Sequence, residues 1–143
     1  MKRNAEQLFG GSLRAQTAAA AIGLVAAVGL LVFVLVFSEI CLTKLENRVM
    51  PLIDAAIGAA GAGDTEKANA LGTVIDRELR DAEGTLMLIA GHRDLMEMLR
   101  ASGEVVALGA HADPDSYISA LGTVRTCFRL ILENNDLSVG NIL

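Results

Sequence analysis

The stretch AAAAIGLVAAVGLLVFVLVF, from Ala18 to Phe37, contains twenty residues without a charged side chain. At about 1.5 Å of rise per residue, such a helix is about 30 Å long, which matches the hydrocarbon core of a bilayer. A cleaved signal peptide has a shorter apolar region and ends at a small-x-small site, and the VFSEIC sequence that follows lacks one. The sequence therefore predicts a transmembrane helix over 18–37.

The charges on either side of this segment predict its orientation. Basic residues near a membrane span favour the cytoplasmic side. Those before the span are Lys2, Arg3 and Arg14, and the nearest ones after it are Lys44 and Arg48. We therefore expect 1–17 to be a cytoplasmic basic tail and 38–143 to be periplasmic or extracellular, at the cell inner (plasma) membrane. The formal net charge of −5 argues against a nucleic-acid partner, because such partners need a basic surface.

Apolar residues continue at helical spacing beyond the span. They recur three and four positions apart and form a short heptad seam, made of Leu42, Leu45, Val49, Leu52 and Ala56. Two interpretations fit this seam. It is either a packing face for other helices of the same chain or the contact of a homodimer through the juxtamembrane helix. Pro51 removes one helix hydrogen bond, so we expect a kink or a local restart there.

The region 38–102 as a whole is predicted to be a helical spine. Its weakest part is AIGAAGAGDTEKA, from Ala56 to Ala68, which is either a turn or a softened helix with a new cap at Asp64 or Thr65. An apolar stripe then resumes, consisting of Leu71, Ile75, Leu79, Ala82, Leu86 and Ile89. Charged pairs at i,i+4 spacing on the other side are Asp76 with Arg80 and Arg77 with Asp81. Gly91 is expected to break the pattern before a short helix from His92.

The last region, 103–143, is predicted to contain a loop, a helix and a strand. The loop covers 103–116, and Asp113 followed by Pro114 is a good helix start. The apolar face of that helix contains Ile118, Leu121, Val124, Phe128 and Ile131. Asn134, Asn135 and Asp136 predict a polar turn. LSVGNIL, residues 137–143, alternates at its start and predicts the opening of a strand.

The sequence offers no group of residues that predicts catalysis. We assign no catalytic, cofactor-binding or metal-ligating residues and no cofactor, and we expect the chain not to be an enzyme. The two cysteines, Cys41 and Cys127, are expected to be unpaired small apolar residues, although a Cys41–Cys41 bridge across a dimer is an alternative. The two histidines, His92 and His111, are nineteen positions apart and are expected to be surface imidazoles.

The order of these features resembles the start of a double-Cache (dCache) extracytoplasmic sensor domain. Such domains occur in bacterial chemoreceptors (methyl-accepting chemotaxis proteins), sensor histidine kinases and membrane diguanylate cyclases. The resemblance rests on LIAGHRDLMEMLRASG, residues 88–103, and on TCFRLILENNDLSVGNIL, residues 126–143. It implies a mainly α chain in which long extracytoplasmic helices lead into the first strand of a truncated, PAS-like Cache module over 103–143.

The function implied by the resemblance is that of the N-terminal fragment of a membrane-bound sensory receptor. In an intact parent such a receptor binds a small molecule outside the membrane and signals inward. One alternative is the sensory front of a histidine kinase or diguanylate cyclase. Another is a self-contained membrane-anchored helical bundle or scaffold protein. A four-helix-bundle ligand domain is a further alternative, and it requires LSVGNIL to be helical.

Overall fold

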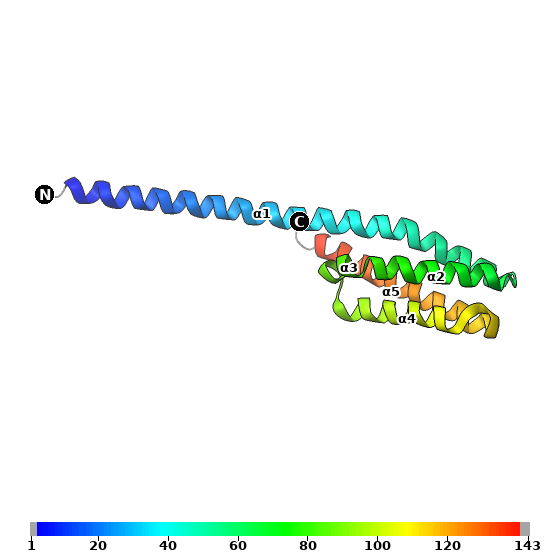
Figure 1. Ribbon diagram of the computed structural model, residues 1–143. Helices are drawn as coiled ribbons and strands as arrows, with labels where there is room; N and C mark the ends of the chain where they lie inside the picture. Colours follow the sequence, from blue (N-terminus) through cyan, green and yellow to red (C-terminus); the bar gives the residue numbers. More distant parts are fainter. Residues whose placement is uncertain (1–2, 141–143) are drawn as a thin grey trace. The chain divides into compact units, whose positions relative to one another are not determined.

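The computed structural model describes the backbone of residues 3–140 and the side-chain surroundings of 17–110 and 113–135. Within 3–140 it contains five helices and no strand (Figure 1), so the predicted mainly α fold is confirmed. The helices are α1 (Arg3–Gly61), α2 (Thr65–Asp81), α3 (Glu83–Ile89), α4 (His92–Ala112) and α5 (Pro114–Gly140).

The chain divides into two compact units, Met1–Phe37 and Ser38–Leu143, and each is described by itself. The division falls at the predicted end of the transmembrane segment. In the first unit, the apolar side chains between Thr17 and Phe37 are almost all exposed. By length and composition α1 can cross a membrane, and none of its most apolar part is buried by protein. A lipid-facing helix has this property, because its apolar side chains need no protein cover.

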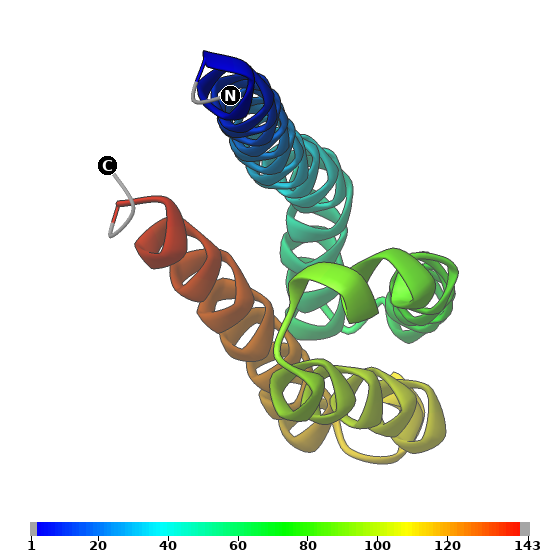
Figure 2. The ribbon, with the colours of Figure 1, turned by 90° about the vertical axis from the view of Figure 1, so that its left-hand side faces the viewer.

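The second unit is an antiparallel four-helix bundle. Its helices are residues 38–61 of α1, then α2, α4 and α5, and the short α3 lies across the near end of the bundle between α2 and α4 (Figure 2). Arg48 of α1 pairs with Glu78 of α2, and Asp54 of α1 pairs with Arg125 of α5. Because α4 packs against both α2 and α5, α1 and α4 occupy opposite corners. The two predicted regions 38–102 and 103–143 thus belong to one unit.

We call the two ends of this bundle the basal end and the distal end. The basal end holds the start of the unit at Ser38, helix α3 and the last turns of α5. The distal end holds the connection from α1 to α2 and the connection from α4 to α5. Residues that lie at the same height along the bundle axis line the same groove. Cys41 and Leu45 lie with Thr85 and Leu86, and Leu42 lies with Leu132.

All four long helices bury one apolar face in a common core. The most buried large side chains, each less than 2% exposed, are Tyr117, Phe128, Ile53, Ile75, Leu79, Leu86, Leu95, Met98, Leu121, Val49, Val105 and Val124. The heptad seam of α1 belongs to this core, since Leu42 is 2% exposed, Leu45 is 6% exposed and Val49 is fully covered. The single chain therefore buries the seam by itself, as the intrachain interpretation predicts. The predicted homodimer through the juxtamembrane helix stays a prediction.

A tight turn joins α1 to α2 and decides between the two interpretations of the glycine-rich stretch. Gly63 adopts φ +78°, a value that glycine reaches without steric cost. The Asp64 N–H donates to the Ala59 carbonyl, and the Asp64 carboxylate accepts from the Lys67 N–H at 3.1 Å. Asp64 is thus the N-cap of α2, one of the two residues that the sequence offered for this cap. The predicted apolar stripe from Leu71 to Ile89 is interrupted at Ala82, where α2 ends and α3 begins. This break was not predicted.

The prediction of a loop over 103–116 is wrong for residues 103–112, because α4 continues to Ala112. Val105, which is 1% exposed, carries the apolar stripe of α4 onwards, and this burial outweighs the weak helix propensity of Gly103. The only non-helical residue inside α4 is Gly109, at φ 60° and ψ 148°. The Asn69 side chain of α2 accepts a hydrogen bond from the Ala110 N–H at 2.6 Å and holds this kink against the bundle.

The start of α5 is confirmed at Asp113 and Pro114. The Asp113 carboxylate accepts from the Ser116 hydroxyl at 2.5 Å and from the Asp115 N–H at 3.1 Å. The hydrogen bond from the Ser116 hydroxyl is the main reason why the pKa of Asp113 lies below its ordinary value. The cap therefore contributes stability above the ordinary carboxyl pKa, and the contribution is lost as the pH falls through the lowered value.

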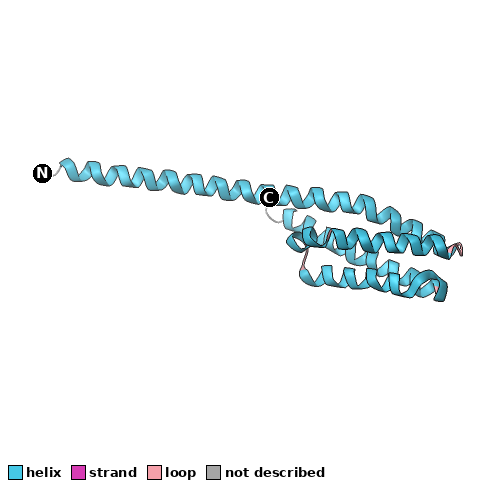
Figure 3. Cartoon of the chain, in the orientation of Figure 1, coloured by secondary structure: helices cyan, strands magenta, loops and turns pink. Residues whose placement is uncertain are grey.

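The end of α5 differs from the sequence prediction. The polar turn at 134–136 and the strand from Leu137 are wrong for 134–140, because α5 is helical to Gly140 (Figure 3). Residues 141–143 of the predicted strand lie outside the described residues. Ile131 is 3% exposed and anchors the preceding turn, so packing outweighs the modest turn preference of Asn and Asp. The helix does not restart at Pro51, since α1 is one helix from Arg3 to Gly61, and the kink expected there stays a prediction.

Tyr117 of α5 reaches α2 at a tightly packed point of the bundle. The fully buried Tyr117 hydroxyl donates to the Ala68 carbonyl at 2.6 Å, and burial raises the pKa of this phenol. A Cβ atom added at Gly72 would lie 2.5 Å from the Tyr117 hydroxyl oxygen and 3.0 Å from Cγ1 of Val105. Glycine at position 72 therefore sets how closely α2, α4 and α5 approach.

We predict that Gly72→Ala lowers the free energy of unfolding by about 1–3 kcal/mol, because the added methyl group overpacks the core. The measurement is chemical unfolding of the full chain in detergent micelles, followed by circular dichroism. The matched control is Gly122→Ala on α5, where an added Cβ meets no atom within 4 Å. This control should be neutral or stabilising by about 0.5–1 kcal/mol, since alanine is the better helix former. Equal effects of the two substitutions would contradict the close packing at Gly72.

Candidate functional site

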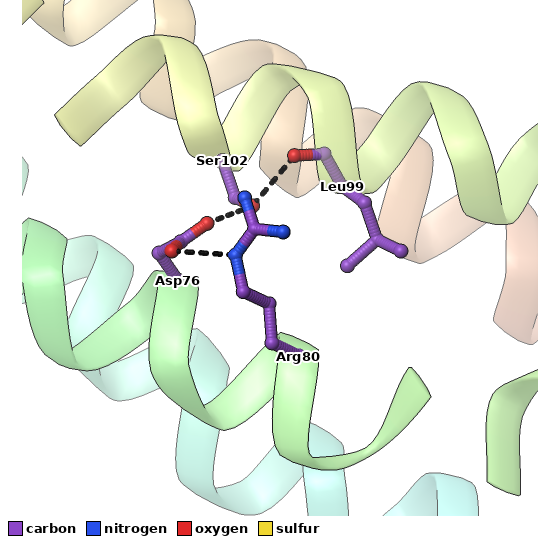
Figure 4. Close-up of polar contacts among 4 residues, drawn as sticks. All are labelled: Asp76, Arg80, Leu99 and Ser102. Carbon is purple, nitrogen blue, oxygen red and sulfur yellow. Dashed lines mark hydrogen bonds and ion pairs between the residues drawn. The ribbon is translucent and has the colours of Figure 1, made fainter. Parts of the chain in front are cut away.

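A polar contact joins α2 and α4 in the middle of the bundle (Figure 4). The Ser102 hydroxyl oxygen lies 2.8 Å from Oδ1 of Asp76 and 3.0 Å from the Leu99 carbonyl oxygen. Its single proton can be donated to one of these acceptors at a time. Nε of Arg80 donates to the other Asp76 oxygen at 2.8 Å, so the predicted i,i+4 pair is confirmed. The pKa of Arg80 is raised, mainly because the Arg80 side chain donates this hydrogen bond to Asp76.

The chemistry of this contact is structural. An ionised Asp accepts hydrogen bonds only, and here it accepts one from each of two helical positions. Ser102 is 1% exposed, so no reactant reaches its hydroxyl from solvent. The Arg80 side chain is about half exposed, at 52%, and covers the carboxylate on the outer side. The contact therefore fixes the register of α4 on α2.

The two thiols do not form a reactive site in the structure. Both Cys41 and Cys127 are free, and Cys127 is buried in the core at 7% exposure. Burial raises the pKa of the Cys127 thiol, and the nearby carboxylates of Glu97 and Asp94 raise it further. Because the thiolate is the nucleophile, a thiol with a raised pKa is unreactive. Cys41 is half-buried in α1 near the basal end.

The histidines and acidic residues show no metal site in the described part of the chain. His92 is exposed at the start of α4, and His111 lies in the last turn of the same helix. Among the residues searched, no three or more His, Cys, Asp or Glu side chains gather to hold a metal ion. Within the described residues, every buried side-chain nitrogen and oxygen has a hydrogen-bond partner. No orphaned buried group there indicates a missing cofactor.

The surface of the bundle has open grooves that can receive a small molecule. The largest described one lies between α4 and α5 and has a volume of about 510 Å³. Its walls come from Asp94, Glu97, Ser119, Gly122, Thr123, Thr126, Cys127 and Leu130. The groove is open at Gly122, because a Cβ atom added to this residue would have no other atom within 4 Å. The α1–α2 groove, which contains the Arg48–Glu78 pair, has a volume of about 300 Å³.

The sequence could not identify this groove or the Asp76–Ser102 contact. Ser102 and Asp76 are 26 positions apart, and neither belongs to a motif. The residues of the α4–α5 groove are separated in the same way, with Asp94 on one helix and Thr126 on the other. Only the predicted i,i+4 pair between Asp76 and Arg80 gave a signal near the contact.

Comparisons with known proteins give no relative for this chain. No protein-family model matches it, no curated protein matches it and no solved structure matches it.

We predict that the Asp76–Ser102 pair shows a larger coupling energy than the Asp76–Arg80 pair. In double-mutant cycles with Asp76→Ala, Ser102→Ala and Arg80→Ala, the buried hydrogen bond to a charged group should contribute about 1–2 kcal/mol. The half-exposed pair with Arg80 should contribute only about 0.3–0.5 kcal/mol, because water screens it. Chemical unfolding of the full chain measures both values. The reverse order would contradict the claim that the buried hydrogen bond between α2 and α4 is the stronger of the two contacts of Asp76.

Proposed function

We propose that residues 38–143 form the extracytoplasmic sensory bundle of a membrane signalling receptor. In this proposal 18–37 is the membrane anchor and the N-terminus is cytoplasmic. The observation that supports it best is an up-and-down four-helix bundle that begins at Ser38, directly after a helical segment long and apolar enough to span a bilayer. The basic residues before that segment support the orientation.

A route for the signal follows from the antiparallel order of the helices. An odd number of chain reversals brings the end of α5 back to the basal end, beside the first turns of α1 in this unit. There Leu42 and Glu46 of α1 line one groove together with Arg129 and Leu132 of α5. A ligand that displaces α5 along α1 would therefore change the position of the helix that continues into the apolar segment. Small shifts between packed helices are a common switching movement.

The ligand in this proposal is a small polar molecule, and its place is the α4–α5 groove. Three hydroxyl groups, on Ser119, Thr123 and Thr126, line the groove together with two carboxylates. Thr123 and Thr126 already donate to backbone carbonyls of α5, so their hydroxyl oxygens remain as acceptors for a ligand. Acceptors of this kind favour a ligand with hydrogen-bond donors. Among residues 3–140 there is no sheet of a Cache module, so the proposal rests on the bundle and not on the resemblance.

A scaffold function is the second candidate, and one observation favours it. The core of the bundle is closed by the chain's own four helices, and the described grooves are open at the surface rather than enclosed. Most small-molecule sites enclose the greater part of their ligand. A membrane-anchored scaffold needs no such site.

The orientation is tested with single reporter cysteines at Ser12 and Ala62, in a Cys41→Ala, Cys127→Ala background. We expect a membrane-impermeant thiol reagent on intact cells to label position 62, in the distal turn, and to spare position 12 until the cells are opened. The positive charges before the span are the physical reason. Labelling of position 12 alone would reverse the orientation, and labelling of both in intact cells would remove the membrane anchor from the proposal.

The ligand site is tested by the thermal stability of the full chain in lipid nanodiscs, with a panel of polar amines, amino acids and polyols. A ligand at a hundred times its dissociation constant should stabilise the bundle by about 2.7 kcal/mol. Gly122→Leu should abolish this stabilisation by filling the groove, whereas Gly58→Leu, on the exposed distal part of α1, should not. If no compound stabilises the chain, or if the two variants respond alike, the scaffold function is favoured instead.

A further inference from the structure

Exposed apolar side chains are distributed unevenly along the bundle. Within the described part of 38–143, six large hydrophobic side chains are at least 46% exposed, and they are Ile40, Met87, Leu88, Met96, Val106 and Leu130. Only Val106 lies in the distal half. Ile40 stands at the start of the unit, Met87 and Leu88 are on α3, Met96 is in the first turns of α4, and Leu130 is level with them on α5. The basal half of the bundle thus carries almost all of this surface.

Helix α3 presents the most exposed of these side chains. Leu88 is 79% exposed and Met87 is 50% exposed, while Leu86 beside them is 2% exposed. The break at Ala82 separates α3 from α2, and Gly91 ends the segment before α4. In Figure 2 α3 and the connection to α4 lie at the end of the bundle that faces the viewer. Leu88 and Met87 form what we call the basal apolar tip.

The basal apolar tip is too small for a stable protein partner. A standard interface covers roughly 800 Å² on each partner, and two adjacent side chains provide only a fraction of that area. A bilayer surface has no such minimum, because each apolar side chain enters it independently. Arg93, an exposed residue with a cationic side chain, follows five positions after Leu88. Long basic side chains beside an apolar group can reach lipid phosphates while the apolar group enters the acyl boundary.

The connectivity of the chain places the basal end next to a membrane. Ser38, the first residue of the bundle, directly follows Phe37, the last residue of the apolar segment. Within the bundle, Cys41 is level with Thr85, one turn before Leu88. The covalent connection at Ser38 therefore lies at the basal end of the bundle.

We infer that the basal apolar tip rests in the lipid interface, with Leu88 and Met87 at the boundary between head groups and acyl chains and Arg93 at the phosphates. This inference rests on the membrane anchoring in the proposed function. It gives the bundle a second attachment to the bilayer, on the α2–α3 side, besides the covalent one through α1. A movement of the bundle relative to the membrane would then pivot about α3.

The test uses the full chain in liposomes, with single cysteines at position 88 or 62 labelled by an environment-sensitive fluorophore. Lipids that carry a nitroxide near the head group quench a fluorophore at the interface. We expect quenching at position 88 to be about threefold or more stronger than at position 62, since an interfacial side chain lies only about 5–10 Å deep. Met87→Asp should reduce the quenching at 88, whereas Val106→Asp, at an equally apolar but distal exposed site, should not.

A label at Val28, within the apolar segment, separates this inference from the anchoring on which it depends. Quenching at 28 by deep nitroxide lipids without quenching at 88 would overturn the tip and leave the anchor intact. Absence of quenching at 28 would remove the anchor and the tip together. If position 88 is shielded only at high protein-to-lipid ratio, with energy transfer between labelled copies, a second copy covers the tip and the lipid contact is wrong.

Discussion

The structure depends on the burial of four apolar helix faces against one another. Beyond the apolar segment, one face of α1 contains Leu42, Leu45 and Val49. These side chains would be exposed on an isolated helix, and α2 and α5 cover them. A buried leucine stabilises a protein by roughly 1.5–3 kcal/mol relative to an exposed one, so loss of any one helix would expose several such side chains. A heptad seam next to a membrane thus serves the fold of the chain itself.

Polar contacts then determine how the four faces align. Tyr117 ties α5 to the Ala68 carbonyl on α2, and Asp76 ties α2 to Ser102 on α4. Both contacts are side-chain hydrogen bonds within an apolar interface, where an alternative register would leave the Tyr117 hydroxyl without a partner. The close approach at Gly72 makes the first of them possible. These contacts explain why α2, α4 and α5 pack as one group, on which the proposed movement of α5 along α1 has to act.

Local signals in the sequence predicted the helix starts, and distant packing decided the rest. Asp64 and Asp113 cap the helices that they were expected to cap, because a capping side chain and the N–H group that it accepts from lie within three residues. The expected loop at 103–112 and the strand from Leu137 failed for one reason. Glycine and Asn-Asn-Asp preferences are worth at most about 1 kcal/mol, and the burial of Val105 and Ile131 outweighs them.

The candidate site could not be predicted from local sequence either, because it depends on the packing of distant residues. The α4–α5 groove joins residues of two helices, and its open floor depends on Gly122, a residue whose local sequence is unremarkable for a helix. The basal apolar tip also required the fold. The predicted apolar stripe includes Leu86 and omits Leu88, in agreement with their burial, but the break at Ala82, which makes α3 a separate helix, was not predicted. The resemblance to a Cache sensor predicted the class of function, and that class remains a proposal.

Native-state amide hydrogen exchange of the full chain in micelles measures whether the four helices close one core. We expect core amides in all four helices, such as those of Ile53, Leu79, Met98 and Phe128, to exchange with one common slow rate. We also expect this rate to be independent of protein concentration, because a single chain closes the core and opens it cooperatively. Amides of α5 that exchange orders of magnitude faster than those of α2, or protection of α1 that grows with concentration, would contradict a self-contained four-helix bundle.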